Sequence, residues 1–526
     1  MSRTLGISSS FFGKRKVERQ EWEHLYQLGF RYAEIALQSC DRSVEAFQEF
    51  IQDNAQGAKA AGLTLWSLHL PYGWDADITM ESHTCMEILK KLMDCGRDMG
   101  FQIFVLHASF EPIKDNREQR IQIGNKNIRE LAKYANSLGM ELAVECLPRT
   151  CIGNTGEECE RLIAGTGAGI CIDINHLFQE TPKAFIERLG HKIITTHISD
   201  NDGIDERHRV PGEGTLDFVE AFQALDAVNL EIPLIFEVRS KSELYPEDIL
   251  KGYQNIGKEY IGVVELRSQR ILMYDILDME HPIWEWNTEP GRLGYASDLK
   301  LRCHKEYGNV VLVCDSRGFA AMIRYSNGEI LWKTWAKGNL HSIELLPDGR
   351  IALAASTGGF LRIYSDEDIF IETALREAHG VLYDPERGTL WGLGEHTLAE
   401  YDPKTLRQMG QIYDFGQEIG CGHDLAPYYG NKNLLWVTTE GGVWVYNKKE
   451  NRFMRDHTMT KRIATENVKG IGNTPYTNQV FYVFQNGALN SWNTDEIWHL
   501  DEKGKSVIAR KDHIYYKIRV MCNRYQ

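Results

Sequence analysis

The sequence predicts a multidomain protein of mixed α/β and all-β class, with a (β/α)8 TIM barrel over residues 1–267 and a six-bladed β-propeller over residues 268–526. In the first half, short β-rich runs alternate with amphipathic helical runs, which is typical of a parallel barrel. After about residue 268 the helical periods vanish, and strand candidates recur at intervals of 38 to 48 residues. A period of this length is the signature of propeller blades. The 526 residues suffice for two large domains.

Eight strand candidates divide the first half, and most of them are continuous apolar runs, as expected for parallel strands that are buried on both faces. They are residues 4–10, 32–37, 64–72, 101–109, 141–148, 169–176, 193–200 and 233–238. Amphipathic helices are predicted between them, for example over Val17–Leu28, Met86–Met99 and Arg117–Leu138, the last of which is closed by Gly139. A final helix is expected over about Pro246–Val264.

The propeller prediction depends on a repeat that is anchored at the inner strand of each blade. Counting from Asp298, the anchors are His341, His379, His423, Lys469 and Lys517, at intervals of 43, 38, 44, 46 and 48 residues. The sixth repeat is incomplete, but strand-like segments at 270–287 offer the strands that it lacks. We therefore expect a last blade that is closed by strands from both ends, 270–287 and 515–521, which leaves no exposed sheet edge.

Composition and charge narrow the function. The net charge of −15 argues against nucleic acid or an anionic membrane as a partner. No run of 18 apolar residues is present, and the N-terminal segment lacks the features of a signal peptide. Eleven cysteines without a CxxC pair are typical of reduced thiols. The expectation is a cytoplasmic protein with a small-molecule substrate, and a homo-oligomer is left open.

Ligand-type side chains stand at the predicted carboxyl ends of six barrel strands, which is where TIM-barrel enzymes place their active sites. These side chains are His69, His107, Glu145, Asp173, His176, His197 and Glu237. Buried carboxylates without partners are costly. A divalent cation is a suitable partner for three acids and a neutral imidazole.

This pattern resembles the sugar-phosphate isomerase/epimerase group of the xylose isomerase-like superfamily. The matching residues are Glu145 in VECLP, Asp173 in CIDINH, His197 in THISDND and Glu237 in FEV, and the loop ERHRVPGEG (206–214) is also family-like. The resemblance covers about half of the chain. It implies that these four residues hold one divalent cation, Mn²⁺ or Mg²⁺, with Co²⁺ or Zn²⁺ as alternatives.

The resemblance also implies a reaction. A metal-dependent isomerase or epimerase of this family removes the proton next to the carbonyl of a ketose or keto-sugar and stabilises the enediolate through the metal. Glu145 and Glu237 would take and return that proton. The expected substrate-binding residues are His69, His107, His176, Arg149, His208 and Arg209. For His176 a supporting contact with Asp173 is the alternative, and for the two arginines it is a salt bridge at the rim.

Other reactions remain open from the sequence. A keto-polyol dehydratase or a 3-keto-glycoside lyase would use the same proton abstraction, and a catalytically inactive barrel would leave a sugar-binding or scaffold protein. The apurinic endonucleases of the superfamily hold three zinc ions. Their nine ligands correspond here to positions 69, 107, 145, 173, 176, 197, 206, 208 and 237, with Glu206 where that family has Asp. The acidic net charge argues against a nuclease.

The repeat anchors predict a second site in the propeller. His341, His379 and His423 recur at one position of three consecutive blades, and Lys469 and Lys517 follow on the next two. Around one channel mouth they would form a positive ring that holds a metal or an anionic ligand. The alternative is that these histidines only form hydrogen bonds between blades.

Overall fold

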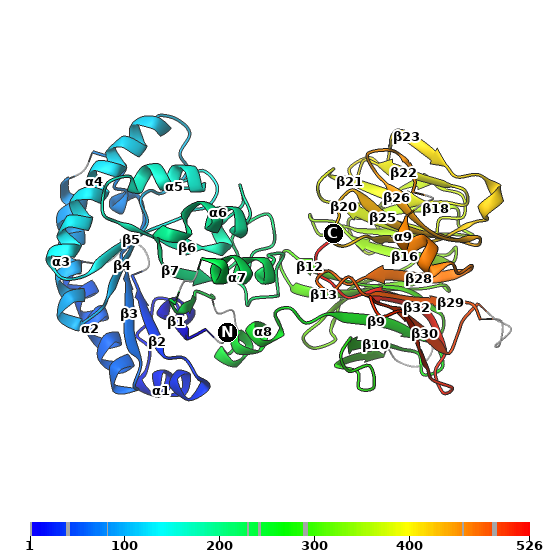
Figure 1. Cartoon of the computed structure of the whole chain (residues 1–526), viewed down its shortest axis with the longest axis horizontal. Coiled ribbons are helices and arrows are strands. Elements are labelled where there is room, and N and C mark those ends of the chain that lie inside the picture. The colour runs from blue at the N-terminus through cyan, green and yellow to red at the C-terminus, as the bar shows by residue number, and fades with distance from the viewer. Residues whose placement is uncertain are drawn as a thin grey trace. The chain divides into compact units, whose positions relative to one another are not determined.

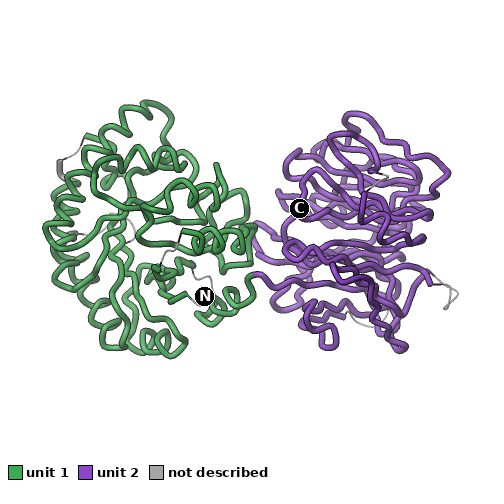
Figure 2. Tube along the Cα trace, viewed as in Figure 1, with its two compact units in different colours: residues 1–256 green, residues 257–526 purple. Residues whose placement is uncertain are grey.

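The computed structural model describes residues 3–37, 43–81, 83–228, 231–239, 244–287, 293–454, 457–486 and 492–526. The chain forms two compact units, residues 1–256 and 257–526 (Figure 2). The boundary predicted from the sequence lies after residue 267. The difference arises because residues 260–265 form a strand of the second unit.

The first unit is a closed barrel of eight parallel strands surrounded by helices, as predicted (Figure 1). Its strands are β1 Leu5–Ser8, β2 Tyr32–Ala36, β3 Thr64–His69, β4 Ile103–Leu106, β5 Glu141–Glu145, β6 Gly169–Asp173, β7 Ile193–Ile198 and β8 Leu234–Phe236. Its helices are α1 Arg19–Leu28, α2 Val44–Ala60, α3 His83–Met99, α4 Arg117–Ser137, α5 Gly156–Ile163, α6 Pro182–Leu189, α7 Phe218–Ala227 and α8 Pro246–Asn255. The barrel closes where β1 pairs with β8 in parallel.

Local sequence explains where these helices begin and end. The side chains of Ser43, Thr155 and Thr181 each accept a hydrogen bond from a backbone N–H in the first turn of the following helix. Gly139 follows α4 with a φ of 75°, as the predicted helix end requires. Among the described helices, none is both long enough and apolar enough to cross a bilayer.

The helix predicted over 246–264 is wrong in its second half. Helix α8 ends at Asn255, and Gly257 adopts a left-handed φ of 81° that stops the helix. The next segment, β9 Tyr260–Glu265, contains the run Ile-Gly-Val-Val, which favours an extended conformation. The propeller therefore begins earlier in the chain than predicted.

The second unit contains six four-stranded antiparallel sheets within the described residues, which confirms the predicted six-bladed propeller. The first five blades follow in chain order, each given from its inner to its outer strand. The first blade contains β12 Ala296–His304, β13 Gly308–Asp315, β14 Phe319–Arg324 and β15 Ile330–Trp335, and the second contains β16 Leu340–Leu345, β17 Ile351–Ala355, β18 Phe360–Tyr364 and β19 Phe370–Ala374. The third blade contains β20 Gly380–Asp384, β21 Thr389–Leu393, β22 Thr397–Tyr401 and β23 Gln408–Asp414, the fourth contains β24 Gly422–Pro427, β25 Leu434–Thr439, β26 Gly442–Asn447 and β27 Arg452–Phe453, and the fifth contains β28 Val468–Asn473, β29 Val480–Phe484, β30 Glu496–Leu500 and β31 Lys505–Ala509. A short helix, α9 Thr458–Ile463, precedes β28.

The sixth blade is built from both ends of the unit. Its order is β11 Trp284–Asn287, β10 Arg270–Asp275, β9 and β32 Tyr515–Val520. Strand β32 pairs antiparallel with β9, with Val263 opposite Ile518, and it contacts the inner strands β12 and β28. This blade thus contains strands from both segments, 270–287 and 515–521, with β9 as an additional strand.

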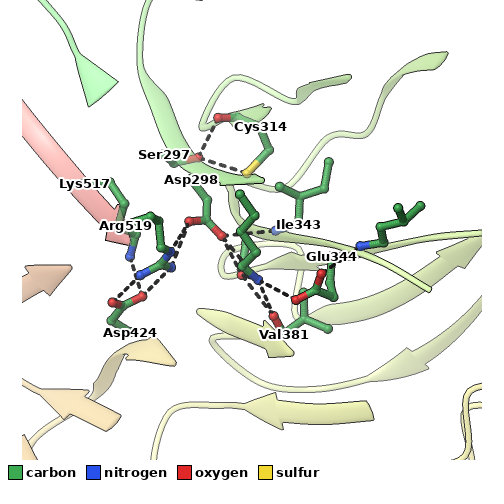
Figure 3. Close-up of polar contacts among 12 residues, drawn as sticks. Ser297, Asp298, Cys314, Ile343, Glu344, Val381, Asp424, Lys517 and Arg519 are labelled. Atoms are coloured by element: carbon green, nitrogen blue, oxygen red, sulfur yellow. Dashed lines mark hydrogen bonds and ion pairs between the residues drawn. The ribbon is translucent and has the colours of Figure 1, made fainter. Parts of the chain in front are cut away.

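Buried charges fill the centre of the propeller. We call Asp298, Lys300, Arg302, Glu344, Asp424, Lys517 and Arg519 the central ion network; none of them is more than 4% exposed. Arg519 lies between Asp298 and Asp424, with Nη2 at 2.8 Å from the former and 2.6 Å from the latter (Figure 3). Lys517 donates to Asp424 at 2.9 Å. The C-terminal strand is thus joined to the first and fourth blades by ion pairs.

We predict that Asp424→Asn destabilises the propeller strongly, because it removes the shared carboxylate of two buried cations. Breaking a buried ion pair on one side costs about 3 to 5 kcal/mol. The measurement is calorimetric unfolding of the full chain. The matched control is Glu372→Gln on outer strand β19, where Glu372 pairs with Arg362 but is 44% exposed, so the loss should be far smaller. Equal shifts in the two variants would contradict the role assigned to the network.

Candidate metal centre and active site

Four side chains converge at the carboxyl-terminal rim of the barrel. Glu145 ends β5, Asp173 ends β6, His197 lies near the end of β7 and Glu237 follows β8. One potential ligand atom from each lies within 4.8 Å of the corresponding atom of every other. All four residues are buried, and Asp173 and His197 are fully so. We call this set the four-ligand cluster.

The cluster lacks hydrogen-bond partners for the atoms that it brings together. Both carboxylate oxygens of Glu145, Oδ2 of Asp173 and Nδ1 of His197 are buried with no hydrogen-bond partner. The His197 Nδ1 atom is 3.2 Å from Oε2 of Glu237 and 3.4 Å from Oε2 of Glu145. Leaving such groups unsatisfied costs free energy that a cation among them would recover. The donor set, three carboxylates and one imidazole, fits a hard or borderline divalent cation.

A buried carboxylate on β2 orients the imidazole. Glu34 Oε2 lies 3.0 Å from Nε2 of His197 and accepts a hydrogen bond from Ser67 Oγ at 2.7 Å. In neutral His197 the Nε2–H would be donated to Glu34, which would leave the lone pair of Nδ1 free for a cation in the cluster, as is common for metal-binding histidines. Glu34 was not among the residues predicted from the sequence. The available signal was a single acid in the middle of the apolar strand Tyr32–Ala36.

The pKa values reflect the crowding of charge. Burial, with smaller contributions from Glu237 and Glu145, raises the pKa of Asp173 to about 7. Burial acts against ionisation of Glu145 as well, but His107 and His197 hold its pKa well below the usual range. Burial disfavours the charged form of His197, yet neighbouring acids, Glu34 and Glu145 among them, raise its pKa well above that of a free imidazole. The raised pKa values of Asp173 and His197 favour protonation of these two side chains, and a divalent cation would take over the compensation of the carboxylate charges.

Two more histidines face Glu145 from β3 and the end of β4. The Nδ1–H of His69 is positioned to donate to the carbonyl of Leu70 at 2.7 Å, so Nε2 faces Glu145 Oε2 at 3.2 Å. His107 approaches the same oxygen at 3.3 Å, and its ring stacks on Tyr72 with centroids 4.8 Å apart. His107 is the more exposed of the two, with 15% of its side chain accessible.

His176 and His208 lie beside the four-ligand cluster. Nε2 of His176 is 2.8 Å from Glu206, while its Nδ1 is 3.0 Å from the carbonyl of Cys146 and 3.3 Å from Oδ2 of Asp173. This geometry favours a supporting role for His176 beside Asp173. His208 adopts a left-handed φ of 46°, its Nδ1 contacts the carbonyl of Glu237 at 2.9 Å, and its Nε2 is buried without a hydrogen-bond partner.

Asp200 organises the loop that carries Glu206, His208 and Arg209. Its Oδ2 accepts hydrogen bonds from the backbone of Gly212 at 2.9 Å and of Gly214 at 2.8 Å. A Cβ at position 214 would come within 2.3 Å of Asp200 Oδ1, so only glycine fits there. Arg209 is buried. Its backbone N–H donates to the carbonyl of Asp200, and its carbonyl accepts from the N–H of Asp200, each at 2.9 Å.

Arg149 is engaged by acids at the rim. Its Nε donates to Glu111 at 2.6 Å, Nη2 lies 3.2 Å from Glu206, and Asp205 accepts from Nη1. These contacts favour the salt-bridge alternative over a direct role in substrate binding. Through Glu206, the same arginine connects the rim to His176.

The anchors of the propeller lie in the second unit and approach one another in pairs. His341 and His379 have ring centroids 4.3 Å apart, and His379 and His423 are 5.7 Å apart. Lys469 Nζ lies 2.9 Å from His423 Nε2, and Lys517 donates to the carbonyl of Lys469 at 2.6 Å. The five predicted residues are therefore neighbours.

Comparison with known proteins divides the chain in the same way as the structure. Residues 22–255 match the family described as the xylose isomerase-like TIM barrel. Residues 262–525 match a family of unknown function designated DUF6528.

Three curated relatives are similar to about a third of the chain. An uncharacterized protein of Methanocaldococcus jannaschii, MJ1311, is 26% identical over 192 residues, which cover 34% of this chain and 66% of that protein. An uncharacterized protein of Sinorhizobium fredii, y4fM, is 27% identical over 29% of this chain and 52% of its own length. Fructoselysine 3-epimerase of Escherichia coli O157:H7 is 24% identical over 33% of this chain and 67% of its own length.

Similar solved structures include the 3-keto-D-glucoside 4-epimerase YcjR of E. coli, with a TM-score of 0.41 and 17% identity over 48% of this chain and 99% of that one. The IOLI protein, solved with a bound zinc atom, has a TM-score of 0.39 and 16% identity over 48% of this chain and 95% of that one. The first half of the chain is a xylose isomerase-like TIM barrel, and through its second half the chain belongs to the family of unknown function DUF6528.

Proposed function

We propose that the barrel is a metal-dependent sugar isomerase or epimerase that acts on a ketose or keto-sugar. The observation that carries the proposal is the convergence of Glu145, Asp173, His197 and Glu237 at the active-site rim, with buried ligand atoms that lack hydrogen-bond partners. The E. coli relative, named as a fructoselysine 3-epimerase, supports the same class of reaction.

The four-ligand cluster would hold the cation, with Mn²⁺ or Mg²⁺ favoured by its oxygen-rich donors and Co²⁺ or Zn²⁺ as alternatives. When bound, a divalent cation supplies polarisation of a carbonyl, which acidifies the adjacent C–H bond. Glu34 would keep the imidazole of His197 in the binding orientation through the 3.0 Å contact.

Glu145 and Glu237 are the proposed proton carriers. They lie on β5 and after β8, and His197 Nδ1 is within 3.4 Å of an oxygen of each. A carboxylate on one side of the reacting carbon takes the proton, and the carboxylate on the other side returns it, which inverts that carbon. The buried surroundings exclude water and strengthen each electrostatic contact.

The other polar side chains have positioning roles in this proposal. His69 and His107 would line the pocket beside Glu145, and the partial exposure of the His107 side chain would make it accessible to a sugar hydroxyl. His176 holds Asp173 in place, and His208 is available to a substrate oxygen through its unpartnered Nε2. Dehydration or β-elimination from a keto-polyol or 3-keto-glycoside would begin with the same proton removal, and product analysis would distinguish these reactions from epimerisation.

We predict that Glu145→Gln and Asp173→Asn each lower Mn²⁺ occupancy by at least about ten-fold, because each removes an ionised ligand from the cluster. The measurement is elemental analysis after loading with Mn²⁺ and desalting. The matched control is Glu141→Gln, which lies on the same strand as Glu145 but is exposed at the opposite end and should keep full occupancy. Equal Mn²⁺ occupancy in all three variants would contradict the assignment of Glu145 and Asp173 as metal ligands.

We also predict that Glu145→Gln and Glu237→Gln each slow exchange of the proton next to the carbonyl by at least about a hundred-fold, because each lacks one proton carrier. Exchange is followed by NMR in D₂O with D-fructose, D-psicose and a 3-keto-glucoside. Excess Mn²⁺ is present, and occupancy is measured in parallel, so that metal loss is separated from loss of the base. Unchanged exchange in both metal-loaded variants would exclude the two-glutamate mechanism.

One observation favours a second candidate, a three-zinc phosphodiesterase. His69, His107 and Glu145 form one group of closely spaced ligand atoms, and His176, Glu206 and His208 form another, in addition to the four-ligand cluster. All nine positions of the endonuclease pattern are therefore close together in this structure.

Metal stoichiometry distinguishes the two candidates. As an isomerase, the protein should bind one cation per chain at neutral pH, and His208→Asn should leave that number unchanged, because His208 lies outside the four-ligand cluster. Elemental analysis after zinc loading provides the count. Three zinc ions per chain, reduced to two in His208→Asn, together with cleavage of DNA at abasic sites, would favour the phosphodiesterase.

A further inference from the structure

We propose that the mouth of the propeller channel binds a small oxyanion, a carboxylate or phosphate group, through His341, His379, His423 and Lys469. This site is separate from the barrel chemistry and lies within the second unit. Two independent features support it: the arrangement of the four side chains, and an excess of buried positive charge around them.

The four side chains stand at one level of four consecutive blades. His341 is in β16, His379 directly precedes β20, His423 is in β24 and Lys469 is in β28. The ring centroids of adjacent histidines are 4.3 Å and 5.7 Å apart, and Lys469 Nζ is 2.9 Å from Nε2 of His423. His379 and His423 remain partly exposed, so the group is accessible from solvent.

Charge beneath this group is unbalanced. The central ion network contains four cations, Lys300, Arg302, Lys517 and Arg519, and three carboxylates, Asp298, Glu344 and Asp424. Lys517 also donates to the carbonyl of Lys469, which joins the network to the mouth.

Lys469 adds a fifth buried cation. Its ammonium lies 4.6 Å from the ring centroid of Trp492 and contacts His423, and no carboxylate of the described residues lies within ion-pair distance of it. Buried positive charge without a counterion is costly, and a bound anion would provide the missing charge.

Burial and the excess of positive charge lower the pKa values of all four side chains at the channel mouth. Burial and the nearby Lys517 lower the pKa of Lys469 to about 7. Burial, Lys469 and His379 lower the pKa of His423 to about 2, and burial with both lysines lowers that of His379 to about 4. Burial, His379 and Lys517 likewise hold the pKa of His341 well below its usual value.

The acids that face the group are Asp424 from β24 and Glu440, which follows β25, and Tyr516 OH lies 3.3 Å from His341 Nδ1. An anion would raise all of the lowered pKa values, so binding should take up protons. Affinity should therefore weaken as the pH rises through about 7, where Lys469 loses its proton in the free protein.

The contacts disfavour the two alternatives. Among the described residues, the sets of His, Cys, Asp and Glu side chains close enough to share a cation do not include the three histidines, which argues against a metal. The histidines contact one another through their rings, and His379 Nδ1 is positioned to donate to the carbonyl of Glu377 in its own segment at 2.9 Å. Two of the histidines do contact another blade, His423 through Lys469 at 2.9 Å and His341 through Tyr516 at 3.3 Å. Hydrogen bonding between blades does not explain His379 or the close packing of the three imidazole rings.

Titration calorimetry on the full chain tests the site, with inorganic phosphate in one arm and D-glucuronate in the other. Each titration is repeated in two buffers of different ionisation enthalpy, which reveals proton uptake. We expect binding of at least one anion, with uptake of protons at pH 7. Phosphate alone would assign a phosphoryl ligand, and glucuronate alone a sugar carboxylate.

Two variants localise the binding. Lys469→Met should weaken the affinity by about ten-fold or more because it removes a donor to the anion. His379→Asn should have a similar effect because it removes an imidazole that takes up a proton when the anion binds and then donates through Nε2. Lys333→Met, on the exposed outer strand β15, is the matched control and should bind as the wild type does. Lys469→Met should keep or raise the thermal midpoint of the free protein, since it removes an uncompensated buried charge. If Lys469→Met fails to fold, the anion affinity of His379→Asn alone decides whether the site is correctly placed.

The proposal is overturned if the wild type binds neither anion, or if both variants bind with wild-type affinity. It is also overturned if affinity is unchanged while the thermal midpoint falls in the variants, because the residues would then serve stability alone.

Discussion

Charge removed from water must be compensated, and both halves of this chain are built around that requirement. At the rim of the barrel, three carboxylates and an imidazole are buried, and several of their ligand atoms have no hydrogen-bond partner. In the centre of the propeller, carboxylates and cations are paired at short distances. The first arrangement is costly unless a cation enters it, whereas in the second each carboxylate already has a cationic partner on another strand. The same physical constraint therefore underlies the proposed metal site in one unit and the structural centre of the other.

The precision of the rim depends on strands that supply none of the four ligands. Glu34 on β2 contacts His197 on β7 across the barrel interior, and Ser67 on β3 holds Glu34 in turn. A shift of β2 or β3 would therefore rotate the imidazole away from Glu145 and Glu237. The closed barrel provides the rigidity that such a site needs, because each strand is fixed by parallel pairing on both sides.

Much of the architecture could be predicted from the sequence because its signals are periodic. The alternation of apolar strands with amphipathic helices predicted the barrel, and the recurring anchors from Asp298 to Lys517 predicted the blades. The rim residues could be predicted because ligand-type side chains follow apolar strands. Strand β9 was missed because its residues continue the apolar pattern of α8, and only Gly257 marks the break. Glu34 was missed because its partner, His197, is distant in sequence and meets it only in the closed barrel.

The closure of the sixth blade has a consequence for how the protein is made. Strand β32 is the last propeller strand to leave the ribosome, yet it pairs with β9, one of the first, and Ile514 donates to Glu265 across 249 positions of sequence. Until residues 515–520 emerge, one edge of β9 is unpaired, and the carboxylates of Asp298 and Asp424 lack their ion pairs with Arg519. The barrel can complete its own strand pairing long before that point. During translation, the nascent propeller is therefore the part of the chain that is exposed to mispairing and chaperone capture, and a ribosome that stalls shortly before β32 leaves a finished barrel attached to an unclosed ring.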